Sequence, residues 1–174
     1  FQFAIYSPPM GTATAPYPPG YSGFGKNPSL LCGTDASHSC LIATSMYGPV
    51  SQRFEAFGTS KTETQETLPA GWHIVTFVNG LGSDKDHWYY DGAEVNGYVT
   101  QGTGGILHPS TGNYQIGGSA QYTGTWWLGK VAAAWAWSTA LSATDVAASA
   151  KSAMDYVRSK GAAQAYRPTI HNNP

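Results

Sequence analysis

Closely spaced turn signals are the feature that most constrains how this chain can fold. Asn79-Gly80, Asp91-Gly92 and Gly48-Pro49 are typical of them, because Gly adopts positive φ, Asn and Asp tolerate the left-handed region, and Pro fixes φ. The segments between the turns are short and rich in β-branched and aromatic residues, which favours strands. We expect strands over residues 1–7, 40–47, 52–57, 61–67, 72–78, 87–90, 95–100, 113–116 and 128–137. This spacing predicts an all-β fold, a two-sheet antiparallel sandwich.

The length and composition agree with a single β domain. A chain of 174 residues is long enough to bury roughly two-thirds of its unfolded surface around one core. Charged residues make up only 11%, against about a quarter in an average globular domain. We expect residues 1–165 to form the domain and residues 166–174 to be a linker or tail. Because residues 1–7 already have the pattern of a strand, we expect the chain to be part of a longer protein.

One segment has a helical pattern, over residues 143–159. Ser142 is placed to cap it, Asp145 lies in its first turn, and Gly161 follows its end. Its apolar residues recur at helical spacing and are Val146, Ala150, Ala153, Met154 and Val157. We expect this stripe to pack on the sandwich, with an interface to another subunit as the alternative.

The strand before this helix has two different faces. We expect Val131, Ala133, Trp135 and Trp137 on one face and Ala132, Ala134 and Ala136 on the other. Small alanine side chains let another layer approach closely, so the helix or the second sheet is expected there.

Charge and hydropathy exclude two classes of partner. The net charge is −1, and there is no basic cluster of the kind that binds nucleic acid or an anionic membrane surface. No apolar run approaches the roughly 20 residues that span a bilayer. We therefore expect neither nucleic-acid binding nor membrane insertion.

Cys32 and Cys40 flank the short segment GTDASHS. This small-residue loop favours a disulfide between them, and a pair of free thiols is the alternative. No Cys/His set has the spacing of a zinc site.

Three blocks carry a family resemblance. They are WHIVTFVNGLGSDKDHWYYDGAEVNGY at 72–98, NYQIGG at 113–118 and WWLGKVAAAWAWSTALSATDV at 126–146. In order and spacing they resemble the laminin-G-like domains of the concanavalin A-like lectin/glucanase superfamily. The resemblance implies a jelly roll of two curved sheets, with any activity at the concave face or on the rim loops.

The sequence disfavours catalysis. Glucanases of this superfamily carry a Glu-x-Asp-x-x-Glu strand, whose glutamates project on one face about 5 Å apart. The nearest counterpart is Glu63 and Glu66, which are three residues apart instead of five and have no Asp between them. We expect His73 to be a core or strand-surface histidine and Asp91 to be a turn residue, so no enzymatic activity is expected.

A sugar-binding site needs an aromatic platform with polar groups at its edge. The candidates adjoin turns or loops: Tyr47, Trp88, Tyr122, Trp126 and Trp127, together with Tyr17 and Tyr21 in the proline-rich segment 8–28. For that segment, an aromatic lid on one edge of the sandwich is the alternative.

No cofactor is required by these patterns, but calcium remains open. Asp35, Asp84 and Asp86 are the carboxylates in expected loops that could serve as its ligands. The alternative is that these carboxylates only solvate their loops.

The combined interpretation is a non-catalytic carbohydrate- or ligand-binding module of the lectin type. It would belong to an extracellular, cell-surface or virion protein and bind a glycan or a surface protein. The alternative is a structural or adhesive domain of a virion, tail fibre or filament, which would contact other subunits and bind no sugar.

Overall fold

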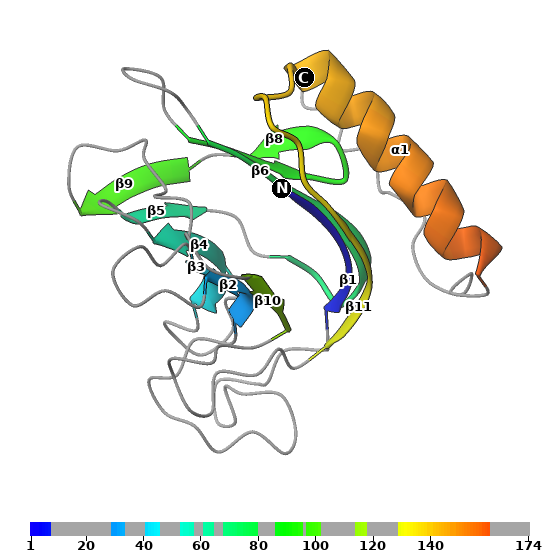
Figure 1. Ribbon diagram of the computed structural model, residues 1–174, viewed down its shortest axis with the longest axis horizontal. Helices are drawn as coiled ribbons and strands as arrows, with labels where there is room; N and C mark the ends of the chain where they lie inside the picture. The colour runs from blue at the N-terminus through cyan, green and yellow to red at the C-terminus, as the bar shows by residue number, and fades with distance from the viewer. Residues whose placement is uncertain are drawn as a thin grey trace.

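The chain forms two antiparallel β-sheets and one helix (Figure 1). The computed structural model describes residues 1–7, 29–33, 41–45, 53–57, 61–64, 68–79, 86–95, 97–101, 114–117 and 129–160. The five-stranded sheet has the order β11-β1-β6-β7-β8 and the six-stranded sheet the order β10-β2-β3-β4-β5-β9. This mostly β, antiparallel architecture confirms the predicted fold class at that level, whereas the jelly-roll connectivity stays a prediction.

The element bounds show where the turn signals predicted strands well. The five-stranded sheet contains β1 (Gln2–Ser7), β6 (Gly71–Val78), β7 (His87–Tyr90), β8 (Ala93–Val95) and β11 (Lys130–Trp135). The six-stranded sheet contains β2 (Ser29–Gly33), β3 (Leu41–Ser45), β4 (Arg53–Phe57), β5 (Lys61–Thr64), β9 (Gly97–Gln101) and β10 (Tyr114–Ile116). β2 was not predicted. The strand predicted over 95–100 is divided between β8 and β9, which belong to different sheets.

The main core lies on the inner face of the five-stranded sheet. Phe3 and Ile5 of β1 and Val75 and Phe77 of β6 are at most 1% exposed, and they share a cluster with Leu30 and Leu31 of β2 in the other sheet. Because alternate residues of a strand point to opposite faces, the residues between them face outward. The outer face is covered by α1 (Ala143–Ser159), on the side away from the six-stranded sheet (Figure 1).

Helix α1 begins and packs as the sequence predicts. The Ser142 hydroxyl accepts a hydrogen bond from the Asp145 amide at 3.2 Å, which satisfies one of the free N–H groups of the first turn. Four residues of the predicted stripe are buried and Met154 is partly buried; the buried ones are Val146, Ala150, Ala153 and Val157. They pack against outward-facing residues such as Ala4 and Ile74.

A buried polar relay also joins α1 to the sheet. Gln2 is fully buried, and its amide nitrogen donates to the Thr76 hydroxyl at 3.1 Å. The Ser149 hydroxyl donates to the amide oxygen of Gln2 at 2.8 Å. Both ends of this buried amide are therefore satisfied, as a stable core requires.

In the described part of the chain, no helix has the length and apolar character of a membrane-spanning segment.

The predicted face pattern of the strand before α1 holds for Ala133, Ala134 and Trp135 but is wrong at Val131. Ala4 pairs with Ala133 but the next residue, Ile5, pairs with Val131, so β11 carries one extra residue at Ala132. A bulge of this kind reverses the alternation of side chains. Val131 and Ala134 consequently pack on the inner core, and Ala133 and Trp135 on the helix side.

Candidate functional site

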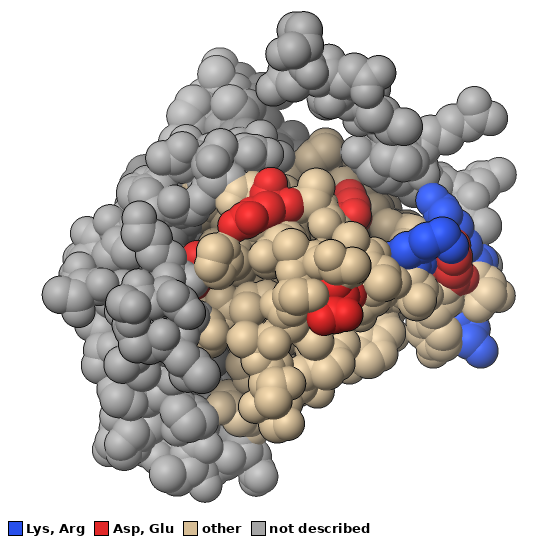
Figure 2. All heavy atoms as spheres, turned by 90° about the horizontal axis from the view of Figure 1, so that it is seen from above, with Lys and Arg blue, Asp and Glu red and all other residues tan. Residues whose placement is uncertain are grey.

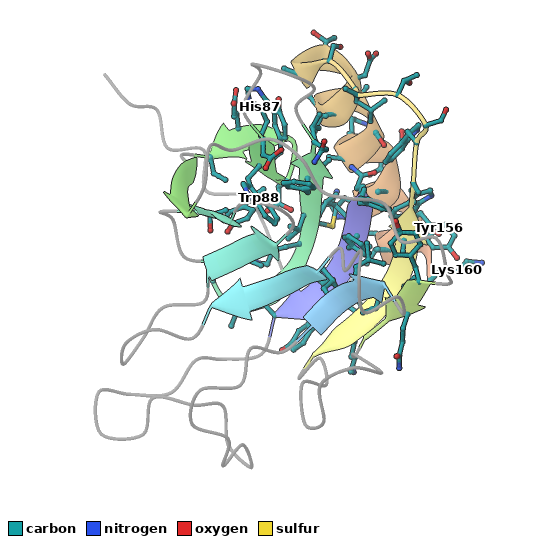
Figure 3. All side chains as sticks on the ribbon, turned by 60° about the vertical axis from the view of Figure 1, so that its left-hand side comes forward. His87, Trp88, Tyr156 and Lys160 are labelled. Atoms are coloured by element: carbon teal, nitrogen blue, oxygen red, sulfur yellow. The ribbon has the colours of Figure 1, made fainter. Side chains whose placement is uncertain are left out.

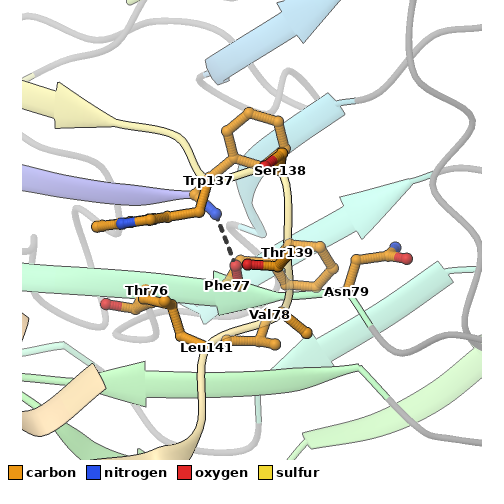
Figure 4. A pocket seen from close by; sticks show the side chains of 10 residues that line it. Thr76, Phe77, Val78, Asn79, Trp137, Ser138, Thr139 and Leu141 are labelled. Carbon is orange, nitrogen blue, oxygen red and sulfur yellow. Dashed lines mark hydrogen bonds between the residues drawn. The ribbon is translucent and has the colours of Figure 1, made fainter. Parts of the chain in front are cut away.

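A pocket of about 280 Å³ lies where β6 and β11 end. It is lined by Phe1, by residues 76–79 at the end of β6, and by residues 137–141 between β11 and α1. We call it the Trp137 pocket (Figure 4).

The walls of the Trp137 pocket are fixed by the sheet and the core. The Phe77 amide donates to the Phe1 carbonyl at 2.8 Å, and the Phe1 nitrogen donates to the Phe77 carbonyl at 2.9 Å. These bonds extend the β1–β6 ladder to the rim of the pocket. On the other side, Leu141 packs against the cluster of Val78, Tyr89 and Val146, which holds the entry to α1 in place.

The pocket combines an aromatic ring with hydroxyl and amide groups. Trp137 is 38% exposed, Ser138 and Thr139 are exposed, and Asn79 is half-buried. Trp137 and Asn79 lie at opposite ends of the view in Figure 4, with Thr139 between them. The Thr76 hydroxyl already accepts the bond from Gln2, so among the described lining residues the exposed polar rim is formed by the Ser138 and Thr139 hydroxyls. Such a rim can hold a ligand that has an apolar face and a polar edge.

A buried histidine–aspartate pair lies elsewhere, below the β7–β8 turn. His73 is 1% exposed; its Nδ1 lies 2.9 Å from Asp91 Oδ2 and its Nε2 lies 3.0 Å from the Pro69 carbonyl oxygen. Both ring nitrogens therefore face oxygen atoms that accept hydrogen bonds, one of a carboxylate and one of a carbonyl. Asp91 also accepts the Ile74 amide at 2.8 Å and adopts a φ of 53°. Both ring nitrogens are used internally, so this pair is structural, and it confirms Asp91 as a turn residue and His73 as a core histidine.

A second, exposed pair lies on the β7–β8 hairpin. His87 Nδ1 lies 2.6 Å from Glu94 Oε1, and both side chains are exposed. Burial, and then the neighbouring Glu94 charge, raise the pKa of Tyr89 above its ordinary value. His87 and Trp88 lie far from Tyr156 and Lys160 in Figure 3.

The described cations of α1 are already engaged by neighbours. Lys151 and Arg158 both pair with Asp155, at 3.1 and 3.5 Å, and Lys160 lies 5.5 Å from the centre of the Tyr156 ring. On the face shown in Figure 2, the Lys and Arg side chains gather over one side of the molecule around acidic groups. Exposed ion pairs of this kind contribute little to stability.

A smaller pocket of about 200 Å³ is lined by Lys151 and Arg158 of α1 and by Asp91.

A family model described as the concanavalin A-like lectin/glucanases superfamily matches residues 24–147. This span covers most of the chain. The chain belongs to the concanavalin A-like lectin/glucanase superfamily. No curated protein and no solved structure matched it. The matched span of this superfamily domain includes all the lining residues of the Trp137 pocket except Phe1.

One predicted ligand-binding residue of the superfamily domain is contradicted by the structure. Trp88 is 1% exposed and its ring lies 4.7 Å from that of Phe77, within the main core. Its interpretation as a rim platform is therefore wrong. The reason is the strand register: Trp88 pairs with Phe77 and Val95, both of which face inward.

The other predicted aromatic platforms lie outside the described residues. They are Tyr17, Tyr21, Tyr47, Tyr122, Trp126 and Trp127. Sequence reasoning missed Trp137, because it assigned this residue to the preceding strand. The signal that could have found it is the run Trp-Ser-Thr directly before a helix cap, which places a large ring and two hydroxyls together in a connection.

The predicted metal and disulfide residues are only partly described. Asp86 lies just before β7 and is half-buried, whereas Asp35 and Asp84 lie outside the described residues. Within the described ranges, no group of three or more His, Cys, Asp or Glu side chains could hold a metal. Cys32 lies opposite Leu41 in the β2–β3 ladder, and Cys40 lies outside the described residues. The calcium site and the disulfide stay predictions.

Proposed function

We propose that this superfamily domain is a non-catalytic carbohydrate-binding module that holds its glycan in the Trp137 pocket. A sugar ring has an apolar face of C–H groups and an edge of hydroxyls, so it needs an aromatic surface beside donors and acceptors. The observation that carries the proposal is that the exposed Trp137 ring and the exposed hydroxyl side chains of Ser138 and Thr139 line the same pocket.

The side chains of the pocket support binding without catalysis. Glycoside hydrolysis in most families uses a pair of carboxylates across the scissile bond, and none of the ten lining residues carries one. The nearest counterpart to such a pair in the sequence is Glu63 and Glu66. Glu63 lies in β5, where it pairs with Glu55 of β4 and Tyr98 of β9. Glu66 lies outside the described residues.

The proposed setting is an extracellular, cell-surface or virion protein that recognises a glycan or a glycosylated surface protein. The expected disulfide between Cys32 and Cys40 fits an oxidising compartment, and the low charge of the chain suits recognition of an uncharged surface. A jelly-roll connectivity of the two sheets is part of this proposal.

A glycan array followed by titration tests the proposal. We expect saturable binding to at least one glycan, quenched or shifted Trp fluorescence on binding, and an affinity weakened at least about tenfold by Trp137→Ala, since central aromatic contacts dominate binding energy. Tyr156→Ala is the matched control, because Tyr156 is similarly exposed, at 45%, but lies on α1 outside the pocket. Equal loss in both variants, or no binding by the wild type, would overturn the proposal.

A structural or adhesive role is the second candidate, and strand β10 favours it. β10 is the outermost strand of its sheet and carries Tyr114 and Ile116, which are 39% and 51% exposed. Outermost strands with apolar side chains tend to pair with other chains. Light scattering that finds an oligomer, dispersed by Ile116→Lys in a protein that binds no sugar, would favour this role. A monodisperse monomer would exclude self-assembly through β10.

A further inference from the structure

We infer that the Trp137 pocket selects a single neutral sugar residue at the end of a glycan, and that it does so without calcium. This inference rests on the proposed function and adds the class of ligand to it. It follows from the charge, the size and the rigidity of the pocket.

Charge decides against acidic glycans. None of the ten described lining residues has an ionisable side chain, and the Phe1 nitrogen already donates to the Phe77 carbonyl. A sialic acid, uronate or sulfate group placed here would lose hydration and gain no cationic partner, which is costly in a partly enclosed site. The described cations on α1 do not compensate, because Lys151 and Arg158 are already paired with Asp155. A neutral ring loses only hydroxyl hydration, which the exposed Ser138 and Thr139 hydroxyls can replace.

The same lining decides against a metal-bridged sugar. Calcium in proteins takes six to eight oxygen ligands, usually including carboxylates. The described lining offers two exposed hydroxyls, and none of its residues carries a carboxylate. Direct stacking and hydrogen bonding must therefore hold the sugar.

The volume decides how much of the glycan enters. The cavity measures about 280 Å³, slightly below the roughly 300 Å³ at which small-molecule pockets usually begin. This space suits one monosaccharide ring and is too small for two. A terminal residue fits best, because only one of its positions is occupied by the rest of the chain.

The pocket is also already formed. The Phe1–Phe77 bonds and the Leu141 packing hold its two sides without a ligand, so little ordering accompanies binding. For a ligand the size of one sugar ring, a dissociation constant on the order of 1 mM is expected.

The test is a titration of the whole chain with methyl glycosides of neutral hexoses and N-acetylhexosamines, with the methyl glycosides of sialic acid and glucuronic acid in parallel. We expect a neutral glycoside to bind at least about tenfold more tightly than either acid. The affinity should change less than about twofold between roughly 0.05 and 0.5 M NaCl, and EDTA should not change it. The di- and trisaccharide ending in the same residue should bind within about threefold of the monosaccharide.

Two variants test whether the sugar binds in the Trp137 pocket. Thr139→Val keeps the side-chain shape and removes one rim hydroxyl, so it should weaken the neutral glycoside about fivefold. Thr144→Val is the matched control, because Thr144 is exposed in the first turn of α1 and does not line the pocket. Equal weakening by both variants counts against the site.

The outcomes separate the two claims. Absence of binding by every glycoside and oligosaccharide overturns both the proposed function and this inference. Binding that is Trp137-dependent but prefers an acid, requires calcium, or tightens about tenfold with each added sugar overturns the inference alone.

Discussion

Removing the Asp91 carboxylate should destabilise the fold more than any surface change. In Asp91→Ala, the His73 Nδ1 donor and the Ile74 amide lose acceptors that now lie 2.9 and 2.8 Å away. A buried donor without its acceptor costs about 1–3 kcal/mol, and alanine at a φ of 53° costs about 1 kcal/mol more. Asp91 is 25% exposed, so water replaces part of the loss, and we expect the free energy of unfolding to fall by about 3 kcal/mol.

Urea denaturation with linear extrapolation measures this change, provided that the slope m stays constant between variants. Asp91→Asn is the matched control. Asparagine tolerates the left-handed region and its oxygen still accepts from the Ile74 amide. Its NH2 group then lies opposite His73 Nδ1, so only that contact changes and about 1 kcal/mol is expected. A loss below about 0.5 kcal/mol in Asp91→Ala, or equal losses in the two variants, would refute the structural role assigned to this carboxylate.

Three further predictions concern the contact between α1 and the sheet and the neighbouring hairpin. Gly92→Ala should lower the free energy of unfolding by at least about 2 kcal/mol, because Gly92 has a φ of +88° and an added Cβ would lie 3.0 Å from the Ala147 Cα; a melting temperature equal to that of the wild type would contradict this. Ser149→Ala should cost about 1 kcal/mol in urea unfolding, since Gln2 Oε1 loses its donor, and an unchanged midpoint would argue against the relay. Burial raises the pKa of Tyr89 above 10.0, so at higher pH the unfolded state releases this proton first and stability should fall as pH rises above 10.0 through the folded-state pKa. Tyr89→Phe should reduce the fall in the free energy of unfolding between urea titrations at neutral and at alkaline pH. A fall equal to that of the wild type would contradict this prediction.

Local chemistry explains which parts of the fold were predictable. The cap at Ser142 and the apolar stripe of α1 depend on residues within one or two turns of each other, so the helix bounds agree with the sequence pattern. The Asp91-Gly92 turn was predictable for the same reason, because the tolerance of Asp and Gly for positive φ depends on those residues alone. Strand positions such as β6 and β7 followed from the turns that bound them.

The candidate site shows where such reasoning fails. Trp88 and Trp137 are both tryptophans beside a connection, yet one is 1% and the other 38% exposed. Nothing local separates them, because burial depends on which distant strand lies opposite. Trp88 faces the core through its pairing with Phe77, whereas β11 ends at Trp135 and leaves Trp137 outside the sheet.

The sequence therefore established the β-rich class, most strand positions, the helix and its packing face, and the turn at Asp91, since each depends on neighbours along the chain. Tertiary packing set the rest. It divided residues 93–101 between two sheets, and it inserted the bulge at Ala132 that reverses the faces of β11. It also brought Phe1, the end of β6 and residues 137–141 together into one pocket. These features arise from contacts between segments far apart in the chain, and local propensity carries no information about which segments will meet.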